Sequence, residues 1–299
     1  KDIIKEQIPE LPEDNLLLEP YARRTAPCVA YSTYTLLKRD PSAVVAVTPA
    51  DIVINDIELF RETLTSALNY AESNPVLMTL GIQPSCPDTE YGYIQVTGGK
   101  EACKKNEPVK VKTFTEKPSQ EIAELFFKSG EFFWNSGIFV WQASVIREEM
   151  ERYIPEITRL FDGWEGALGS PAETVFIERA YTDCIKLSID YGVMEKTDRA
   201  WIYPVHFGWS DIDSWENFYS NVGKKDADGN IANTQKDILQ KSSGNIILSK
   251  NKEKLIVLRG LENFIVADTD DVLLVCPRDD KQYKELVNST RMPGYDKYR

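Results

Sequence analysis

Residues 132–141 read Phe-Phe-Trp-Asn-Ser-Gly-Ile-Phe-Val-Trp. Aromatic and β-branched residues at both ends of this stretch predict a buried strand. Three small or polar residues, Asn135, Ser136 and Gly137, interrupt it. A strand loses packing at a glycine, and a buried asparagine amide destabilises a fold unless it finds hydrogen-bond partners. The stretch therefore predicts a strand of a sheet that meets a polar ligand near the middle of that strand.

A second unusual site lies upstream, in the sequence Phe-Thr-Glu-Lys-Pro at 114–118. Pro118 disfavours a helical conformation at the preceding residue, so we expect Lys117 to be extended. Glu116 can accept hydrogen bonds from hydroxyls, and the Lys117 ammonium can neutralise a phosphate. The alternative is an exposed charge pair before a helix, which would contribute little. Together with Asn135, whose amide can both donate to and accept from hydroxyls, the pair predicts a pocket for a small, polyhydroxylated and phosphorylated ligand.

Hydrophobic periodicity predicts an α/β architecture around these two sites. The apolar runs at 43–48 and 76–82 predict buried strands, as in a parallel sheet, and residues 56–72 between them have helical spacing. Strand, helix and strand in this order are typical of a βαβ unit. Further predicted elements are a helix at 25–38 with Thr25 as its N-cap and Val29, Ala30, Thr33, Tyr34 and Leu37 on its inner face, a hairpin of 91–96 and 109–115, a helix at 118–128 with Ile122, Leu125 and Phe126 inward, and a strand at 201–205.

The composition of the chain changes after Tyr219. Residues 222–236 are polar and rich in Asp, Gly and Asn, and short β-rich runs separated by turn residues follow at intervals of about ten residues. We therefore predict two domains, an α/β domain at 1–221 and a small β-rich domain at 222–299.

Charge and cysteine usage restrict the class of protein. The 299 residues carry a formal net charge of −12, which disfavours nucleic acid and anionic membranes as partners but not a phosphorylated small molecule. The sequence has no run of about 18 apolar residues that would predict a membrane-spanning helix. Five cysteines at wide, irregular spacings fit neither a zinc site nor a disulfide framework and indicate a reducing cytoplasm. A single histidine makes a Ser-His-Asp triad a poor hypothesis.

Two aspartates each follow a predicted strand. Asp51 ends the sequence Thr-Pro-Ala-Asp after the run at 43–48, and Asp211 ends Gly-Trp-Ser-Asp after the strand at 201–205. Ligands of open α/β sheets bind at the carboxyl ends of strands, and two carboxylates with phosphate oxygens and water suit Mg²⁺. The alternative is that each aspartate is a turn or cap residue, and the sequence does not say that the two meet.

Two further segments could bind a ligand through the backbone. Gly92 lies between two tyrosines, where a glycine would let the backbone approach a ligand closely. The loop with Arg24 and Thr25 leads into a predicted helix N-terminus, which favours hydrogen-bond acceptors and anions. The alternatives are a bulge at Gly92 and an ordinary capped loop at Arg24.

These residues occur within a set of motifs that resembles one family. In order, the motifs are Glu-Gln-Ile-Pro-Glu-Leu-Pro-Glu-Asp-Asn-Leu-Leu-Leu-Glu-Pro at 6–20, Arg-Thr-Ala-Pro at 24–27, Pro-Ala-Asp at 49–51, Tyr-Gly-Tyr-Ile at 91–94, Phe-Thr-Glu-Lys-Pro at 114–118, Trp-Asn-Ser-Gly-Ile-Phe at 134–139, Ser-Ile-Asp-Tyr-Gly-Val-Met-Glu-Lys at 188–196 and Phe-Gly-Trp-Ser-Asp at 207–211. Each motif alone is weakly specific, whereas the ordered set covers most of the chain. The chain resembles the bacterial mannose-1-phosphate guanylyltransferases, also called GDP-mannose pyrophosphorylases.

The resemblance implies a Rossmann-like nucleotidyltransferase domain, with a mixed sheet and helices on both faces, and a small C-terminal domain like a left-handed β-helix. It implies that mannose 1-phosphate and GTP give GDP-mannose and pyrophosphate with Mg²⁺, in nucleotide-sugar biosynthesis in the cytoplasm. By resemblance, Asp51 and Asp211 hold the metal, Glu116 and Asn135 bind the mannose hydroxyls, Lys117 binds the sugar phosphate, Gly92 meets the sugar by its backbone, and the loop of Arg24 and Thr25 lies near the guanine. The catalytic set implied in this way is Asp51, Asp211 and Lys117.

The family's glycine-rich phosphate loop has no counterpart in residues 1–299. We expect that loop in a stretch of about two βα units before residue 1, and we expect residues 1–299 alone to have little or no transferase activity. By resemblance, the C-terminal domain could join two copies as a homodimer. Two alternatives remain open: a related nucleotidyltransferase for another hexose 1-phosphate or base, and a non-catalytic homologue that binds a nucleotide-sugar.

Overall fold

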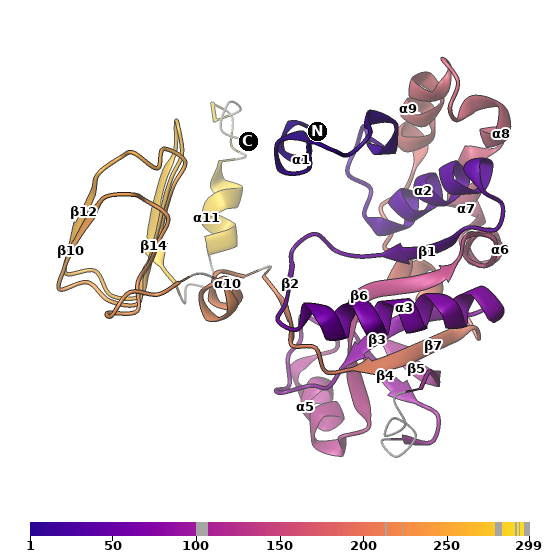
Figure 1. The fold of residues 1–299 in the computed structure, drawn as a ribbon, viewed down its shortest axis with the longest axis horizontal. Helices are drawn as coiled ribbons and strands as arrows, with labels where there is room; N and C mark the ends of the chain where they lie inside the picture. The colour runs from indigo at the N-terminus through magenta and orange to yellow at the C-terminus, as the bar shows by residue number, and fades with distance from the viewer. Residues whose placement is uncertain are drawn as a thin grey trace. The chain divides into compact units, whose positions relative to one another are not determined.

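The computed structural model describes residues 1–99, 107–212, 214–222, 224–278, 283–290, 292, 294 and 295 (Figure 1). The chain packs into two compact units. The first holds residues 1–49 and 56–207, and the second holds residues 50–55 and 208–299. Residues 50–55 and 208–221, which the sequence places in the first domain, thus pack with the second unit.

The first unit is built on a six-stranded mixed sheet in the order β1-β6-β3-β7-β5-β4. β3 runs parallel to β7, whereas β6 is antiparallel to β1, β3 and β4. All residues of β1 are only half-buried, so the expectation that this segment is a buried strand of a parallel sheet is wrong; within the described sheet β1 pairs with β6 alone. The strands are β1 (Val44–Val47), β3 (Leu77–Ile82), β4 (Tyr93–Val96), β5 (Val109–Thr115), β6 (Phe132–Gln142) and β7 (Ala200–Val205).

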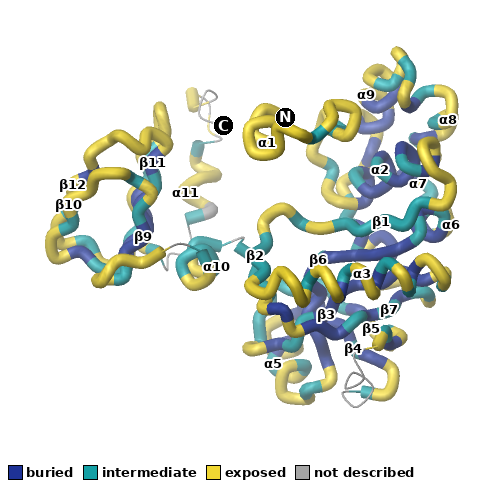
Figure 2. The backbone as a smooth tube through the Cα atoms, viewed as in Figure 1, coloured by how far each residue is buried: buried dark blue, intermediate teal, exposed yellow. Residues whose placement is uncertain are grey.

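Helices cover this sheet because its central strands are apolar on both faces. The first five residues of β3 are all buried, and Figure 2 shows the central strands dark blue. α3 (Ile57–Ser73) packs on β1, β3 and β6, and its buried residues are Thr63, Ala67 and Ala71. α2 (Thr25–Arg39) packs on α6 (Ala143–Tyr153), α7 (Pro155–Thr158) and α8 (Trp164–Ala167). The five residues predicted for the inner face of α2 are all buried.

The helix after Pro118 differs from its prediction. α5 (Gln120–Ser129) buries Ala123, whereas Ile122 and Leu125 are 41% and 66% exposed. The expected inward positions of those two side chains are therefore wrong, because Ala123 and Phe126 face the cluster of Tyr93 and Phe132 instead. The remaining helical segments of this unit are α1 (Asp2–Gln7), η1 (Glu13–Asn15), η3 (Arg159–Phe161), α9 (Glu173–Asp183) and the π-helix η4 (Asp190–Met194).

The second unit is a coil of short strands. One ladder is parallel in the order β9-β11-β13 and ends with the antiparallel β14, and a second ladder pairs β10 with β12 in parallel. Ile246 stacks beside Ile265 in register, and both are fully buried. Repeated parallel pairing of this kind is typical of a β-helix. The elements are β2 (Ile52–Ile54), β8 (Trp209–Asp211), α10 (Trp215–Asn221), β9 (Ile231–Ala232), β10 (Asp237–Gln240), β11 (Ile246–Ser249), β12 (Ile256–Arg259), β13 (Phe264–Asp268), β14 (Leu273–Pro277) and α11 (Tyr283–Ser289).

Within the described part of the chain, none of the helices combines the length and the apolar composition that a membrane crossing needs.

Candidate functional site

Asn135, which interrupts the apolar run of β6, is held by hydrogen bonds within the protein. Gly92 accepts a hydrogen bond from the Asn135 backbone N–H at 2.8 Å. The Asn135 Oδ1 accepts from the Thr79 hydroxyl at 2.9 Å and from the Gly137 N–H at 3.3 Å. Its Nδ2 donates to Asp190 Oδ1 at 3.0 Å. Three of the four hydrogen bonds that the amide can make are thus used within the protein, and one N–H donor remains. The Thr79 hydroxyl has one proton and also lies 3.2 Å from the Ile138 carbonyl; when it donates to Asn135 Oδ1, the amide has only its remaining N–H for a ligand.

Glu116 directly follows β5 and offers a hydrogen-bond acceptor, whereas the Asn135 amide offers a donor. Its Oε2 is buried and has no hydrogen-bond partner among the described residues. This oxygen covers Gly92 so closely that a Cβ at Gly92 would lie 2.2 Å from it. Burial raises the pKa of Glu116 to about 7, the charge of Asp190 adds to this rise, and Lys117 opposes it. A buried acceptor without a donor is a position that a ligand hydroxyl can satisfy.

Lys117 adopts a conformation that its sequence neighbours did not predict. Its φ of 45° lies in the left-handed region, so the expected extended geometry before Pro118 is wrong. β5 ends at Thr115 and α5 begins at Gln120, so the chain must turn sharply within four residues. Strained backbone of this kind persists where surrounding contacts determine it, and it is common at ligand sites. The Lys117 Nζ is 3.7 Å from Glu90 Oε2, and both side chains are about half exposed.

The segment that follows Ile189 supplies residues that the sequence interpretation missed. Asp190 opens the π-helix η4 and bonds the Asn135 amide, and burial raises its pKa. Glu195, directly after η4, accepts the Glu116 backbone N–H at 2.9 Å. The Tyr191 hydroxyl lies 3.5 Å from the Glu116 carbonyl oxygen. The available signal was the motif at 188–196, to which no chemistry was assigned.

The loop with Arg24 and Thr25 is joined to this same segment. The Ala26 N–H donates to the Leu187 carbonyl at 3.0 Å, and Thr25 Oγ1 accepts the Ile189 N–H at 2.9 Å. The prediction that Thr25 caps α2 is therefore wrong, because the N-cap is Arg24, which has a φ of 67° and makes no side-chain cap bond. The contacts place this loop next to the residues that lead into Asp190.

Asp51 and Asp211 belong to the second unit: Asp51 directly precedes β2, and Asp211 is the last residue of β8, the strand that pairs with β2. Asp211 pairs with Ile52 in the antiparallel ribbon of β2 and β8, and the Ile212 N–H donates to the Asp51 carbonyl at 3.0 Å. No group of three or more His, Cys, Asp or Glu side chains able to hold a metal occurs among the described residues. Two carboxylates completed by phosphate oxygens are nevertheless a donor set that Mg²⁺ accepts, so the residue types fit this ion.

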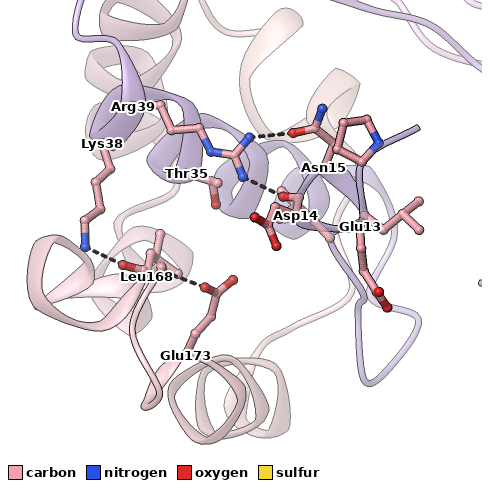
Figure 3. Close-up of a pocket in the computed structure, with 12 residues that line it drawn as sticks. Glu13, Asp14, Asn15, Thr35, Lys38, Arg39, Leu168 and Glu173 are labelled. Atoms are coloured by element: carbon pink, nitrogen blue, oxygen red, sulfur yellow. Dashed lines mark hydrogen bonds between the residues drawn. The ribbon is translucent and has the colours of Figure 1, made fainter. Parts of the chain in front are cut away.

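A pocket of ≈ 820 Å³ in the first unit is lined by other residues (Figure 3). Lys38 donates to the Leu168 carbonyl, and Arg39 donates to Asn15 Oδ1 at 2.8 Å and to the Asp14 carbonyl at 2.6 Å. The cationic side chains of this pocket thus make bonds within the protein. None of the predicted site residues lines this pocket.

Comparison with known proteins gives two family matches. Residues 2–227 match the nucleotidyl transferase family, and residues 235–289 match the MannoseP isomerase/GMP-like beta-helix domain. Together with the structural likeness below, these matches confirm the predicted α/β nucleotidyltransferase fold followed by a β-helix-like domain.

Similar sequences are known from several bacteria. The chain is 35% identical over 281 residues to the xanthan biosynthesis protein XanB of Xanthomonas campestris pv. campestris (strain B100), covering 93% of this chain and 58% of that protein. It is 33% identical over 309 residues to the mannose-1-phosphate guanylyltransferase of Escherichia coli (strain K12), covering 99% of this chain and 62% of that protein. The chain thus spans about three fifths of the length of these relatives.

A solved structure also resembles the whole chain. It is the crystal structure of mannose-1-phosphate geranyltransferase from Thermus thermophilus, with a TM-score of 0.77 and 26% sequence identity, covering 97% of this chain and 88% of that one.

Proposed function

This chain belongs to the nucleotidyl transferase family, and from this premise we propose that the protein makes GDP-mannose and pyrophosphate from mannose 1-phosphate and GTP. The observation that carries the proposal is the pair of Glu116 and Asn135. One presents a buried acceptor and the other a single N–H donor, which together suit the hydroxyls of a sugar. Relatives similar over nearly the whole chain are named for this reaction, which supports the same conclusion.

The proposed reaction needs no general base. The phosphate oxygen of mannose 1-phosphate is already an anion, and it attacks the α-phosphorus of GTP in line. A bond forms from that oxygen to the α-phosphorus as the bond from the α-phosphorus to the bridging oxygen breaks, and pyrophosphate leaves with the electron pair. The protein must align two anions and neutralise their charge. We assign the sugar hydroxyls to Glu116 and Asn135, and the sugar phosphate to the exposed Lys117.

We further propose that Asp51 and Asp211 hold Mg²⁺, which would neutralise phosphate charge when bound. The loop with Arg24 and Thr25 is proposed to lie near the guanine. Its bonds to the segment that leads into Asp190 support a place for this loop beside the sugar-binding residues. Gly92 is proposed to meet the sugar by its backbone, next to the Glu116 carboxylate, whose Oε2 lies close to Gly92.

A substrate panel tests the proposal. The full-length protein is purified and incubated with Mg²⁺, each of several hexose 1-phosphates and each of the four NTPs, and pyrophosphate and nucleotide-sugar are measured. We expect mannose 1-phosphate with GTP to be the preferred pair. A different preferred pair would identify a related nucleotidyltransferase, and binding of a nucleotide-sugar without turnover would identify a binding protein.

Two lysines of one region give a matched comparison. Lys117→Ala should raise the KM for mannose 1-phosphate, because it removes the cation assigned to the phosphate. Lys112→Ala, an exposed residue on the same strand β5, should leave the kinetics unchanged. Equal kinetics for the two variants would reject the assignment of Lys117.

A further inference from the structure

We infer that Asp190 is a positioning residue for hexose recognition: its carboxylate holds the Asn135 amide in the one orientation that presents an N–H donor to the sugar. The inference rests on the proposed function, since it explains how the proposed sugar site keeps its selectivity. Asp190 itself is not assigned a contact with the sugar.

The surroundings of the Asn135 amide distinguish its two ends. Nδ2 faces the Asp190 carboxylate at 3.0 Å, and Oδ1 faces the Gly137 N–H at 3.3 Å. Turning the amide over would place its oxygen against a carboxylate and its NH₂ against a backbone N–H. Both contacts would then be repulsive, because an ionised carboxylate only accepts and a backbone N–H only donates. Thr79, whose hydroxyl can rotate, does not by itself fix the choice.

The same segment also holds the acceptor half of the site. Glu195 accepts the backbone N–H of Glu116 at 2.9 Å, at the end of β5. Asp190 and Glu195 lie at the two ends of the π-helix η4, so one short segment binds the strand that carries Asn135 and the strand end that carries Glu116. Short π-helical turns are often found at functional sites. The segment thus orients the Asn135 donor and holds the backbone from which the Glu116 acceptor extends.

A purely structural role for Asp190 is the competing explanation. Asp190 makes a buried, charge-assisted hydrogen bond, so removing its carboxylate would destabilise the protein even if Asp190 had no role in ligand binding. The two explanations differ in what happens to ligand affinity. If Asp190 positions Asn135, its removal lowers the affinity for the sugar phosphate alone. If its role is purely structural, its removal lowers the affinity for all ligands or for none.

The test uses Asp190→Ala, Asp190→Asn and Asp198→Asn in the full-length protein. Asp198 is a matched control because its side chain is 76% exposed and its weak ion pair with Arg152 spans 3.9 Å. Calorimetry measures the affinity for mannose 1-phosphate and for GTP separately. NMR of the Asn135 side-chain amide, assigned by the loss of its signals in Asn135→Asp, reports the hydrogen bond directly.

Asp190→Ala should weaken mannose 1-phosphate binding about 10- to 100-fold and leave GTP binding unchanged. D190N, whose new amide oxygen can still accept from Asn135, should recover most of this loss, and D198N should bind like the wild type. In Asp190→Ala the Asn135 amide signals should shift and exchange faster. If D190A does not fold, Asp190→Leu takes its place, because leucine keeps a similar branched side-chain shape and cannot accept a hydrogen bond from Asn135.

Three results would overturn the inference. They are unchanged mannose 1-phosphate affinity in D190A, an equal loss for both ligands, and unchanged Asn135 amide signals in D190A. Failure of the wild type to bind any hexose 1-phosphate would instead reject the proposed function, and the amide signals would still decide whether Asp190 orients Asn135.

Discussion

Replacing Gly92 by alanine tests the geometry of the sugar site with a single methyl group. A Cβ at Gly92 would lie 2.2 Å from Glu116 Oε2 and 3.3 Å from the Asn135 Cβ. The first distance is far inside van der Waals contact, so the carboxylate must move. Gly92 is not among the residues with positive φ, so alanine adds bulk there without backbone strain.

The structure predicts that affinity changes far more than stability. The clashing atom is the end of a flexible, half-buried side chain that can swing towards solvent. The overpacking cost of about 1–3 kcal/mol for a rigid neighbour is therefore largely avoided, and a Gly-to-Ala change recovers about 0.4–1 kcal/mol through the unfolded chain. We expect the free energy of unfolding to change by less than about 1 kcal/mol. Losing a hydroxyl's hydrogen bond to the Glu116 carboxylate should weaken mannose 1-phosphate binding about 10- to 100-fold.

Calorimetric titration with mannose 1-phosphate and urea unfolding measure the two quantities. Gly166→Ala is the control, because a Cβ at this exposed glycine of α8 meets nothing within 4 Å. Adding Glu116→Asp to Gly92→Ala shortens the clashing side chain by one methylene and should restore part of the affinity. Gly92→Ala binding mannose 1-phosphate as tightly as the wild type would refute the placement of the carboxylate over Gly92.

Three further predictions concern pH, metal and packing. The pKa of Glu116 rises from 4.5 to about 7 on folding, so the folded state binds more protons than the unfolded state in this range. The contribution of Glu116 to stability is thus full at low pH and is lost as pH rises to about 7, and Glu116→Gln should flatten the profile of unfolding free energy in urea between pH 4.5 and 7. In the full-length protein, Asp51→Asn and Asp211→Asn should each raise the Mg²⁺ concentration needed for half-maximal GDP-mannose synthesis, and an unchanged Mg²⁺ titration would contradict their assignment. Ile265→Ala should lower the free energy of unfolding of the second unit in urea by about 2–5 kcal/mol, because the Ile265 side chain is fully buried. Val257→Ala is the control and should change this free energy by less than about 0.5 kcal/mol, because Val257 is 59% exposed. Equal effects of the two substitutions would contradict a core around Ile265.

Local sequence signals predicted most helices and strands of the first unit. The hydrophobic spacing of α2 and of β3 is strong enough that the buried residues could be named in advance. The predictions that failed did so for one reason: contacts with distant parts of the fold, and not the local sequence, decided where these side chains lie. Leu125 is apolar at helical spacing and yet 66% exposed, because Ala123 of α5 takes the buried position. Thr25 has the right type for an N-cap, but its hydroxyl bonds the Ile189 N–H from a distant segment.

Residue type alone therefore determined which chemistry the protein could offer: a carboxyl, an ammonium and an amide, which suit the proposed sugar phosphate, within an α/β fold with a β-rich C-terminal part. Tertiary structure decided how these groups are used. Thr79 and Asp190 bond the Asn135 amide from 56 and 55 residues away, and they leave it a single donor. Glu195 holds Glu116 from 79 residues away. Such partners come from other strands and turns of the fold, and hydrogen bonding depends on distance and direction in space, which the spacing of residues along the chain does not encode.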